Sequence, residues 1–93
     1  MSVTLYNTTS SAFNFTGSKN GLHDPPQQIG PGDEAEIRYT PGQPSVMWYI
    51  DEDRQGQVVV EVGNHTQGNK LWGEGAFSLR QDGRPDYWVI VTH

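Results

Sequence analysis

Residues 64–75 hold the side chains of this sequence whose types best suit ligand binding. They read NHTQGNKLWGEG, an indole among amides, a hydroxyl, an imidazole, an ammonium and a carboxylate. A sugar presents an apolar C–H face that packs on a flat ring, and hydroxyl groups that need fixed donors and acceptors. The alternative is a hairpin loop whose tryptophan folds back onto the sheet, since tryptophan is usually well buried. For a sugar, the segment offers Trp72 as the ring and, as polar groups, Asn64, His65, Asn69, Lys70 and Glu74.

A second candidate segment runs from residue 81 to residue 88 and reads QDGRPDYW. Its Asp-Gly pair predicts a hairpin turn, and its proline stiffens the backbone between an arginine and an aspartate. Beside an aromatic ring, an aspartate that accepts and an arginine that donates suit the vicinal diol of a sugar. The alternative is a turn with a surface ion pair, which contributes little energy. If both segments share one end of the fold, the further ligand candidates are Asp82, Arg84, Asp86 and Tyr87. The residues leave open which ring packs on the ligand, because Trp48, Tyr87 and Trp88 qualify beside Trp72.

No pattern in the sequence predicts catalysis. It contains no cysteine, no G-x-S-x-G elbow and no H-E-x-x-H motif. Its carboxylates stand on turns and on the polar side of a strand at 34–40, where nothing predicts that two of them flank a cleft as in a glycosidase. His23 lies in a proline-rich loop, and we expect it to form a structural hydrogen bond. We therefore expect a non-enzyme without catalytic residues.

The acidic segment 51–56 resembles the opening of a calcium-binding loop, with acids at its first and third positions and glycine at its sixth. The twelfth position is Val62, where such a loop needs a bidentate glutamate. The three histidines are far apart and no thiolate accompanies them, which argues against structural zinc. We expect a solvated hairpin turn between strands at 46–50 and 57–62, and neither a metal nor another cofactor.

The spacing of apolar residues predicts strands throughout the chain. Apolar residues alternate with polar ones at 3–6, 13–16 and 34–40, and segments rich in Gly and Pro separate the strands. No window of a dozen residues combines a helical period with freedom from Gly and Pro. The 93 residues therefore predict a single domain, residues 1–93, with an all-β fold: an antiparallel β-sandwich of six to eight strands.

Three of these strands, at 46–50, 58–62 and 87–91, are apolar on both faces. A sandwich covers one face of each sheet, so the other face has to meet a loop, a ligand or a second subunit. A chain this short has a thin core, and it lacks cysteines for disulfides. We predict a homodimer, with a covering loop as the alternative.

The composition excludes two classes of partner. The net charge is −5 at pH 7, whereas a nucleic-acid-binding protein needs a basic face. No apolar run approaches the length of a membrane-spanning helix, so we expect no transmembrane segment. The first residues show neither the basic region nor the apolar core of a signal peptide. We expect the protein to be cytoplasmic, or released without a conventional signal peptide.

Two stretches in the N-terminal half carry a resemblance to known proteins. They are Tyr6-Asn7-Thr8-Thr9 and residues 21–32, which read GLHDPPQQIGPG. The pattern is similar to that of the aegerolysin and actinoporin-like β-sandwich proteins, over the N-terminal half of the chain. This resemblance implies a β-sandwich and, as an alternative function, the binding of membrane sphingolipids.

In size, composition and lack of cysteine, the whole chain resembles the small dimeric α-galactosyl-binding lectins of mushroom fruiting bodies. That resemblance implies a fungal, non-enzymatic and metal-independent hemagglutinin, which recognises terminal α-galactose and crosslinks glycans as a homodimer. Two weak sites in a symmetric dimer gain roughly 10²–10⁴ in avidity when both engage. We therefore predict a lectin for α-galactosyl glycans, and the alternative is an aegerolysin-like sphingolipid-binding protein.

Overall fold

A computed structural model describes residues 1–20 and 23–93. None of these residues is helical, so this part of the chain offers no helix that could cross a membrane. The strands are β1 (Ser2–Asn7), β2 (Phe13–Lys19), β3 (Gln28–Ile29), β4 (Glu34–Arg38), β5 (Ser45–Asp51), β6 (Gly56–Val62), β7 (Lys70–Gly75), β8 (Phe77–Gln81) and β9 (Tyr87–Thr92). The all-β prediction is confirmed, and the nine strands exceed the expected range because β3, of two residues, is counted. Gly21 and Leu22, at the start of the second stretch of the resemblance, lie outside the described residues.

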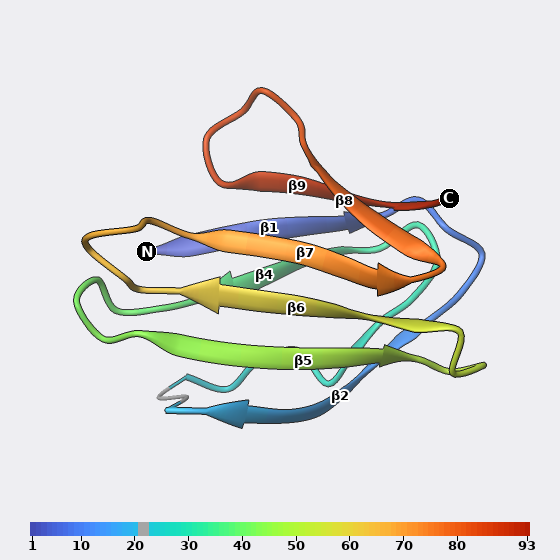
Figure 1. The fold of residues 1–93 in the computed structure, drawn as a ribbon, viewed down its shortest axis with the longest axis horizontal. Helices are drawn as coiled ribbons and strands as arrows, with labels where there is room; N and C mark the ends of the chain where they lie inside the picture. Colours follow the sequence, from blue (N-terminus) through green and yellow to red (C-terminus); the bar gives the residue numbers. More distant parts are fainter. Residues whose placement is uncertain (21–22) are drawn as a thin grey trace.

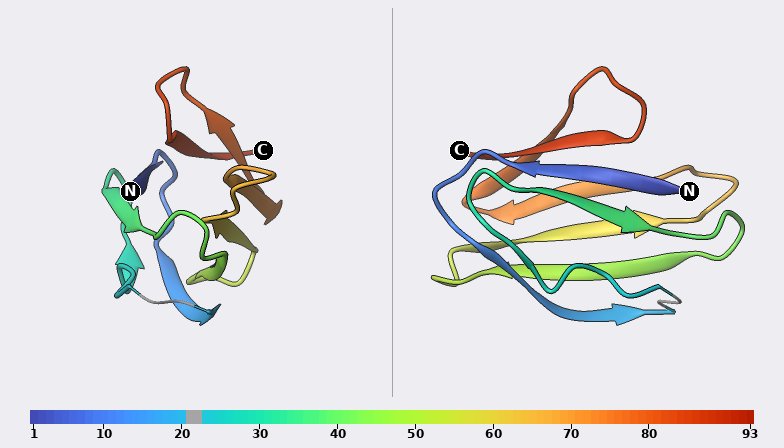
Figure 2. Two further views of the ribbon diagram at one scale, coloured as in Figure 1. Left: turned by 90° about the vertical axis from the view of Figure 1, so that its left-hand side faces the viewer. Right: turned by 180° about the vertical axis from the view of Figure 1, so that it is seen from behind.

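The strands form two sheets that pack as a sandwich (Figure 1). The four-stranded sheet has the order β4-β1-β9-β8, and the five-stranded sheet has the order β3-β2-β5-β6-β7. All strand pairs are antiparallel except β1 and β9, which run parallel in the middle of the four-stranded sheet. The first and last strands therefore lie side by side in one sheet, with the N- and C-termini at opposite ends of the pair (Figure 2).

The core lies between the sheets and consists of the inward residues of the alternating strands. In β1 and β4, Val3, Leu5 and Ile37 are fully buried, while the glutamates between them on β4 are exposed. From the other sheet, Phe13 and Tyr49 fill the same layer, and burial raises the pKa of Tyr49 well above that of an ordinary tyrosine. Period-two alternation thus predicts correctly which residues enter the core.

Asn7, within the first stretch of the resemblance, is a buried structural residue. Its amide nitrogen donates to the carbonyl oxygens of Ser11, Ile29 and Gly30, and its oxygen accepts from the backbone and hydroxyl of Thr9. These donor–acceptor distances lie between 2.7 and 3.2 Å. One side chain therefore ties the end of β1 to the connection between β1 and β2 and to the end of β3, in the manner of a buried polar group that needs all its partners.

The segment 64–75 is a loop only in its first half. From Lys70 onward it forms β7, which leads through Ala76 into β8 and so crosses from the five-stranded to the four-stranded sheet. The crossing brings backbones close together: a Cβ on Gly73 would lie 2.5 Å from the carbonyl oxygen of Phe77. Gly75 has a φ of 72°, which favours glycine. The glycines therefore mark a sharp corner between two strands, where the sequence alone suggested a loop.

Candidate functional site

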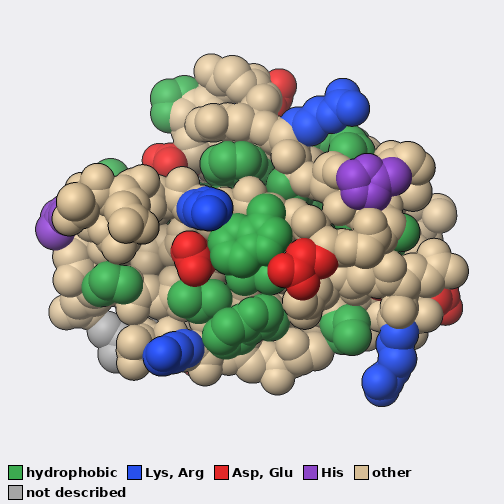
Figure 3. Space-filling model, viewed as in Figure 1, with side chains coloured by type: hydrophobic (Ala, Val, Ile, Leu, Met, Phe, Trp, Pro, Cys, Tyr) green, Lys and Arg blue, Asp and Glu red, His purple; other side chains and the backbone are tan. Residues whose placement is uncertain are grey.

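Trp72 lies on the outward side of β7, on the face of the five-stranded sheet that is turned away from the core. Directly opposite it on β6 is Val59, and directly opposite Val59 on β5 is Trp48. We call these three residues the tryptophan row. Figure 3 shows apolar side chains gathered at the centre of this face, with acidic side chains on either side. Residues far apart in the sequence thus form one continuous strip.

Val59 shows how the tryptophan row is packed. Val59 is only 2% exposed, yet it does not belong to the core between the sheets. Its chain neighbours Val58 and Val60 do. Its cover therefore comes from side chains on the outer face, where the two indoles stand directly opposite it on either side. Trp48 and Trp72 are themselves half-buried. The valine thus lies between the two indoles and packs against them, and part of each ring stays accessible.

Polar side chains fix the edges of the Trp72 ring. Its Nε1–H donates to Oε2 of Glu74 at 3.0 Å, and Gln57 on β6 donates to the other carboxylate oxygen. These hydrogen bonds, first that of Gln57 and then that of Trp72, lower the pKa of Glu74, so the carboxylate stays ionised. Nζ of Lys70 lies over the ring, 5.3 Å from its centroid. Three of the predicted residues are therefore assembled as expected, because alternate residues of β7 share one face.

A pocket of about 190 Å³ adjoins this face where β6 ends and β7 begins. Its polar lining includes Glu61, which is the cross-strand partner of Lys70, together with Lys70 and the loop residues Asn64 and Gln67. The Oδ1 of Asn64 accepts hydrogen bonds from the backbone of Thr66 and Gln67, which fixes the turn. Sequence reasoning included Asn64 but missed Gln57, Glu61 and Gln67, whose placement depends on strand register.

His65 and Asn69 belong to another part of the surface. They line a second hollow, of about 280 Å³, together with Tyr39 and Asp86, and Asn64 and Gly68 stand between this hollow and the pocket at Lys70. The Oδ1 of Asn69 accepts from the backbone N–H of Gly63, and its Nδ2 donates to the Tyr39 hydroxyl and to Asp86. The two predicted segments therefore do meet, through Asn69 and Asp86 at 3.3 Å, but away from Trp72.

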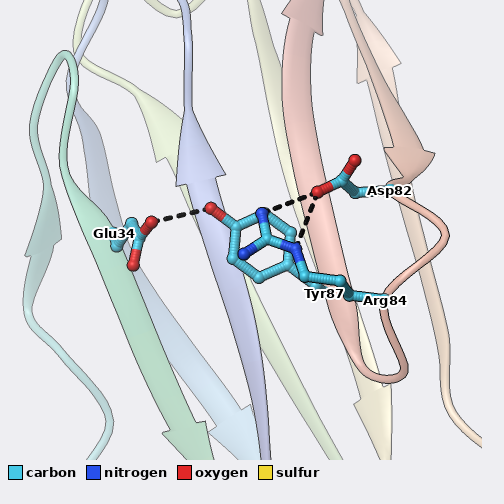
Figure 4. Close-up of polar contacts among 4 residues, drawn as sticks. All are labelled: Glu34, Asp82, Arg84 and Tyr87. Carbon is cyan, nitrogen blue, oxygen red and sulfur yellow. Dashed lines mark hydrogen bonds and ion pairs between the residues drawn. The ribbon is translucent and has the colours of Figure 1, made fainter.

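Within the second segment, residues 82–86 form the loop between β8 and β9, and the side chain of Arg84 lies over the ring of Tyr87 (Figure 4). Arg84 forms an ion pair with Asp82 at 2.7 Å, and its guanidinium carbon lies 3.7 Å from the centroid of the Tyr87 ring. The hydroxyl of Tyr87 donates to Glu34 at 2.7 Å, and this bond is the main reason that the pKa of Tyr87 is raised. The hydrogen bond to Asp82 likewise raises the pKa of Arg84. These polar groups therefore bind one another, which is the ion-paired turn considered as the alternative.

The remaining candidates, Trp88, Asp51 and His23, contact other parts of the protein. Trp88 packs against the core, which leaves Trp48 and Trp72 as the indoles of the outer surface. Segment 51–56 is the predicted hairpin turn, although Asp51 is fully buried and its Oδ2 accepts from the backbone of Gln55. Among the residues that the structure describes, no three His, Asp or Glu side chains are grouped so that they could hold a metal ion. His23 forms a hydrogen bond to Thr40 at 3.0 Å, as predicted.

The outcome for the strands with two apolar faces differs between the sheets. On β9, Arg84 covers Tyr87, so the covering-loop alternative is right at that position. On β5 to β7, the tryptophan row stays partly accessible at the surface.

Comparison of the chain with protein-family models, with curated proteins and with solved structures finds no match. The resemblances noted in the sequence therefore stay predictions.

Proposed function

We propose that the protein is a non-enzymatic lectin that binds a glycan on the outer face of its five-stranded sheet. The observation that carries this proposal is the setting of Trp72. Its half-buried indole has Glu74 bonded at one edge and Lys70 beside its ring. A partly accessible ring with a fixed acceptor at its edge and a donor above it provides the kinds of group that bind a sugar.

The chemistry of the face supports binding rather than catalysis. A glycosidase needs a carboxyl group whose pKa is raised so that it can act as an acid. The pKa of Glu74 is lowered, and Glu61 lies on the far side of the tryptophan row from Glu74. Glu74 is therefore suited to accept hydrogen bonds from hydroxyl groups, which is the role of a carboxylate in a binding site.

For the sugar itself, we propose a galactose-containing glycan with a terminal α-galactosyl unit. This part of the proposal rests on the resemblance to the small mushroom lectins. The lack of charge in galactose is compatible with a face whose nearest ionised groups have both signs, Glu61, Lys70 and Glu74.

We further propose a homodimer that pairs through the opposite side of the sandwich. On the outer face of the four-stranded sheet, β9 turns Val89 and Val91 outward, and Tyr6 of β1 lies directly beside Val89. All three are half-buried. A symmetric contact there would leave both tryptophan rows free, so the dimer could crosslink glycans. Light scattering tests this: we expect a dimer that Val89→Lys dissociates, and a monomeric wild type would contradict it.

A glycan array with the purified protein, followed by fluorescence titration, tests the lectin proposal. We expect a set of related α-galactosides among the hits and a change in tryptophan emission on binding. Trp72→Ala should lower the affinity at least tenfold, about 1–3 kcal/mol for the loss of an aromatic anchor. Tyr6→Ala, which truncates an aromatic residue on the other outer face, is the matched control: in titrations with a monovalent α-galactoside, where dimerisation adds no avidity, it should bind normally. Silence on the array together with binding to sphingomyelin liposomes would favour the aegerolysin-like alternative instead.

A further inference from the structure

We infer that the tryptophan row binds two consecutive sugar units of an uncharged glycan, one over Trp72 and the next over Trp48, with the sugar chain lying across the strands. The inference rests on the proposed function and adds the length, direction and charge of the ligand. Three features of the face carry it: the spacing of the indoles, the open ends of the row and the polar residues along its two sides.

The spacing of the indoles matches more than a single sugar. Trp48 and Trp72 stand on strands that are separated by β6, and both are in register with Val59. Neighbouring strands lie about 4.8 Å apart, so the two attachment points are about 10 Å apart. One pyranose ring cannot cover both indoles, whereas two linked rings can. Because the side chains of this face cover Val59, which is only 2% exposed, no open gap separates the two indoles.

The tryptophan row is open at both of its ends. At one end, β7 is the edge strand of the five-stranded sheet. At the other end, Gly17 on β2 stands directly opposite Trp48, and a Cβ on this glycine would meet no atom within 4 Å. The row therefore crosses three strands, and beyond Trp48 it meets a residue without a side chain. A track open at both ends leaves room for a second sugar unit beside the terminal one.

Polar residues border the row on both of its long sides. Gln57 and Glu74 face each other across β6 and β7 on one side, and Glu61 and Lys70 do so on the other. Hydroxyl groups of the sugar over Trp72 therefore find donors and acceptors on both sides, whereas Trp48 has the apolar Val46 and Ile50 beside it on β5. The two carboxylates on β6 and β7 outnumber the one ammonium group there, that of Lys70, which disfavours an acidic sugar.

The test compares methyl α-galactoside with neutral galactose-containing disaccharides and trisaccharides. We expect the wild-type affinity to rise about tenfold or more from monosaccharide to disaccharide, as expected for a second stacked ring. Trp48→Ala should abolish this increase, so that monosaccharide and disaccharide bind equally, whereas Trp72→Ala should weaken the binding of both ligands. Ile50→Ala, on the same face of β5, is the matched control and should keep the increase.

Because Trp48→Ala also uncovers Val59, saturation-transfer NMR on the wild type provides a second readout. Both sugar units of the bound disaccharide should receive saturation on their C–H faces, and saturation of one unit alone would overturn the inference. Equal affinity of the wild type for monosaccharide and disaccharide would also overturn it and leave the proposed lectin function intact. Absence of any glycan binding would refute the lectin function itself. A disaccharide with a carboxylate group should bind more weakly than its neutral counterpart, and tighter binding would contradict the preference for an uncharged ligand.

Discussion

The guanidinium of Arg84 lies over the ring of Tyr87, 3.7 Å from its centroid, while the Tyr87 hydroxyl donates to Glu34 on β4. Together with the ion pair between Arg84 and Asp82, this stack holds segment 82–86 against the outer face of the four-stranded sheet. The segment is therefore ordered by its own side chains. Arginine, aspartate and tyrosine, the residue types that suggested a diol site, here serve to position a loop.

Arg84→Ala should loosen segment 82–86 without changing glycan binding. The substitution removes the stack on Tyr87 and the partner of Asp82, so the hydrogen exchange of this segment should become faster. The midpoint of urea unfolding should fall only slightly, because the ion pair is exposed. Arg80→Ala on β8 makes the same change of charge nearby and is the control. A strong loss of glycan affinity in Arg84→Ala would return this segment to the binding site.

Asn7→Ala should be among the most destabilising substitutions of a polar residue. The side chain is fully buried and forms hydrogen bonds with Ser11, Ile29, Gly30 and Thr9. Each buried group left without a partner costs about 1–3 kcal/mol, so we expect a loss of about 3 kcal/mol or more in the free energy of unfolding. Urea denaturation measures it. Asn14→Ala, which removes one acceptor from Gln28 at an exposed hydrogen bond, should cost far less.

Gly73→Ala should destabilise the corner between β7 and β8. The added methyl group would lie 2.5 Å from the carbonyl oxygen of Phe77, which is backbone and cannot rotate away. Overpacking of this kind typically costs about 1–3 kcal/mol. Gly17→Ala is the matched control, because its methyl group would meet nothing within 4 Å. Thermal melts of the two variants should therefore differ clearly, and equal melting temperatures would show that the corner can relax.

Glycan binding should be insensitive to pH from neutrality down to the ordinary range of a glutamate. Hydrogen bonds from Gln57 and Trp72 lower the pKa of Glu74, so the acceptor stays ionised below about pH 4.3, the value for an unperturbed glutamate. Affinity should fall only as the pH drops through this lowered pKa, because protonation removes the acceptor for Trp72. Fluorescence titrations between pH 3 and pH 8 measure this change in affinity. In Glu74→Gln the decrease at acid pH should disappear, and its persistence would point to another carboxylate.

The alternation of apolar and polar residues was sufficient to predict the fold class and many of the core residues. Alternation at a spacing of two predicts that Val3, Leu5 and Ile37 point inward, and they do, because successive side chains of a strand must point to opposite faces. Turn residues likewise locate the hairpin that follows Asp51. Lys70 and Glu74 were expected near Trp72 because they are its neighbours in the sequence, and the structure adds that all three share one face of β7.

The tertiary structure decided which residues from different strands meet. The pairing of Trp48 with Trp72 through Val59 depends on the register of β5, β6 and β7, which no local window contains. Asn69 turned out to bind Asp86 rather than to face Trp72, because the partners of a polar side chain are set by the neighbouring strand. The sequence did not predict the strand 70–75, because glycines are typical of turns. Gly73 is required here because the backbone of Phe77 approaches it closely at the corner. A sequence specifies side-chain direction locally, whereas a binding face is assembled from hydrogen-bonded neighbours that are distant along the chain.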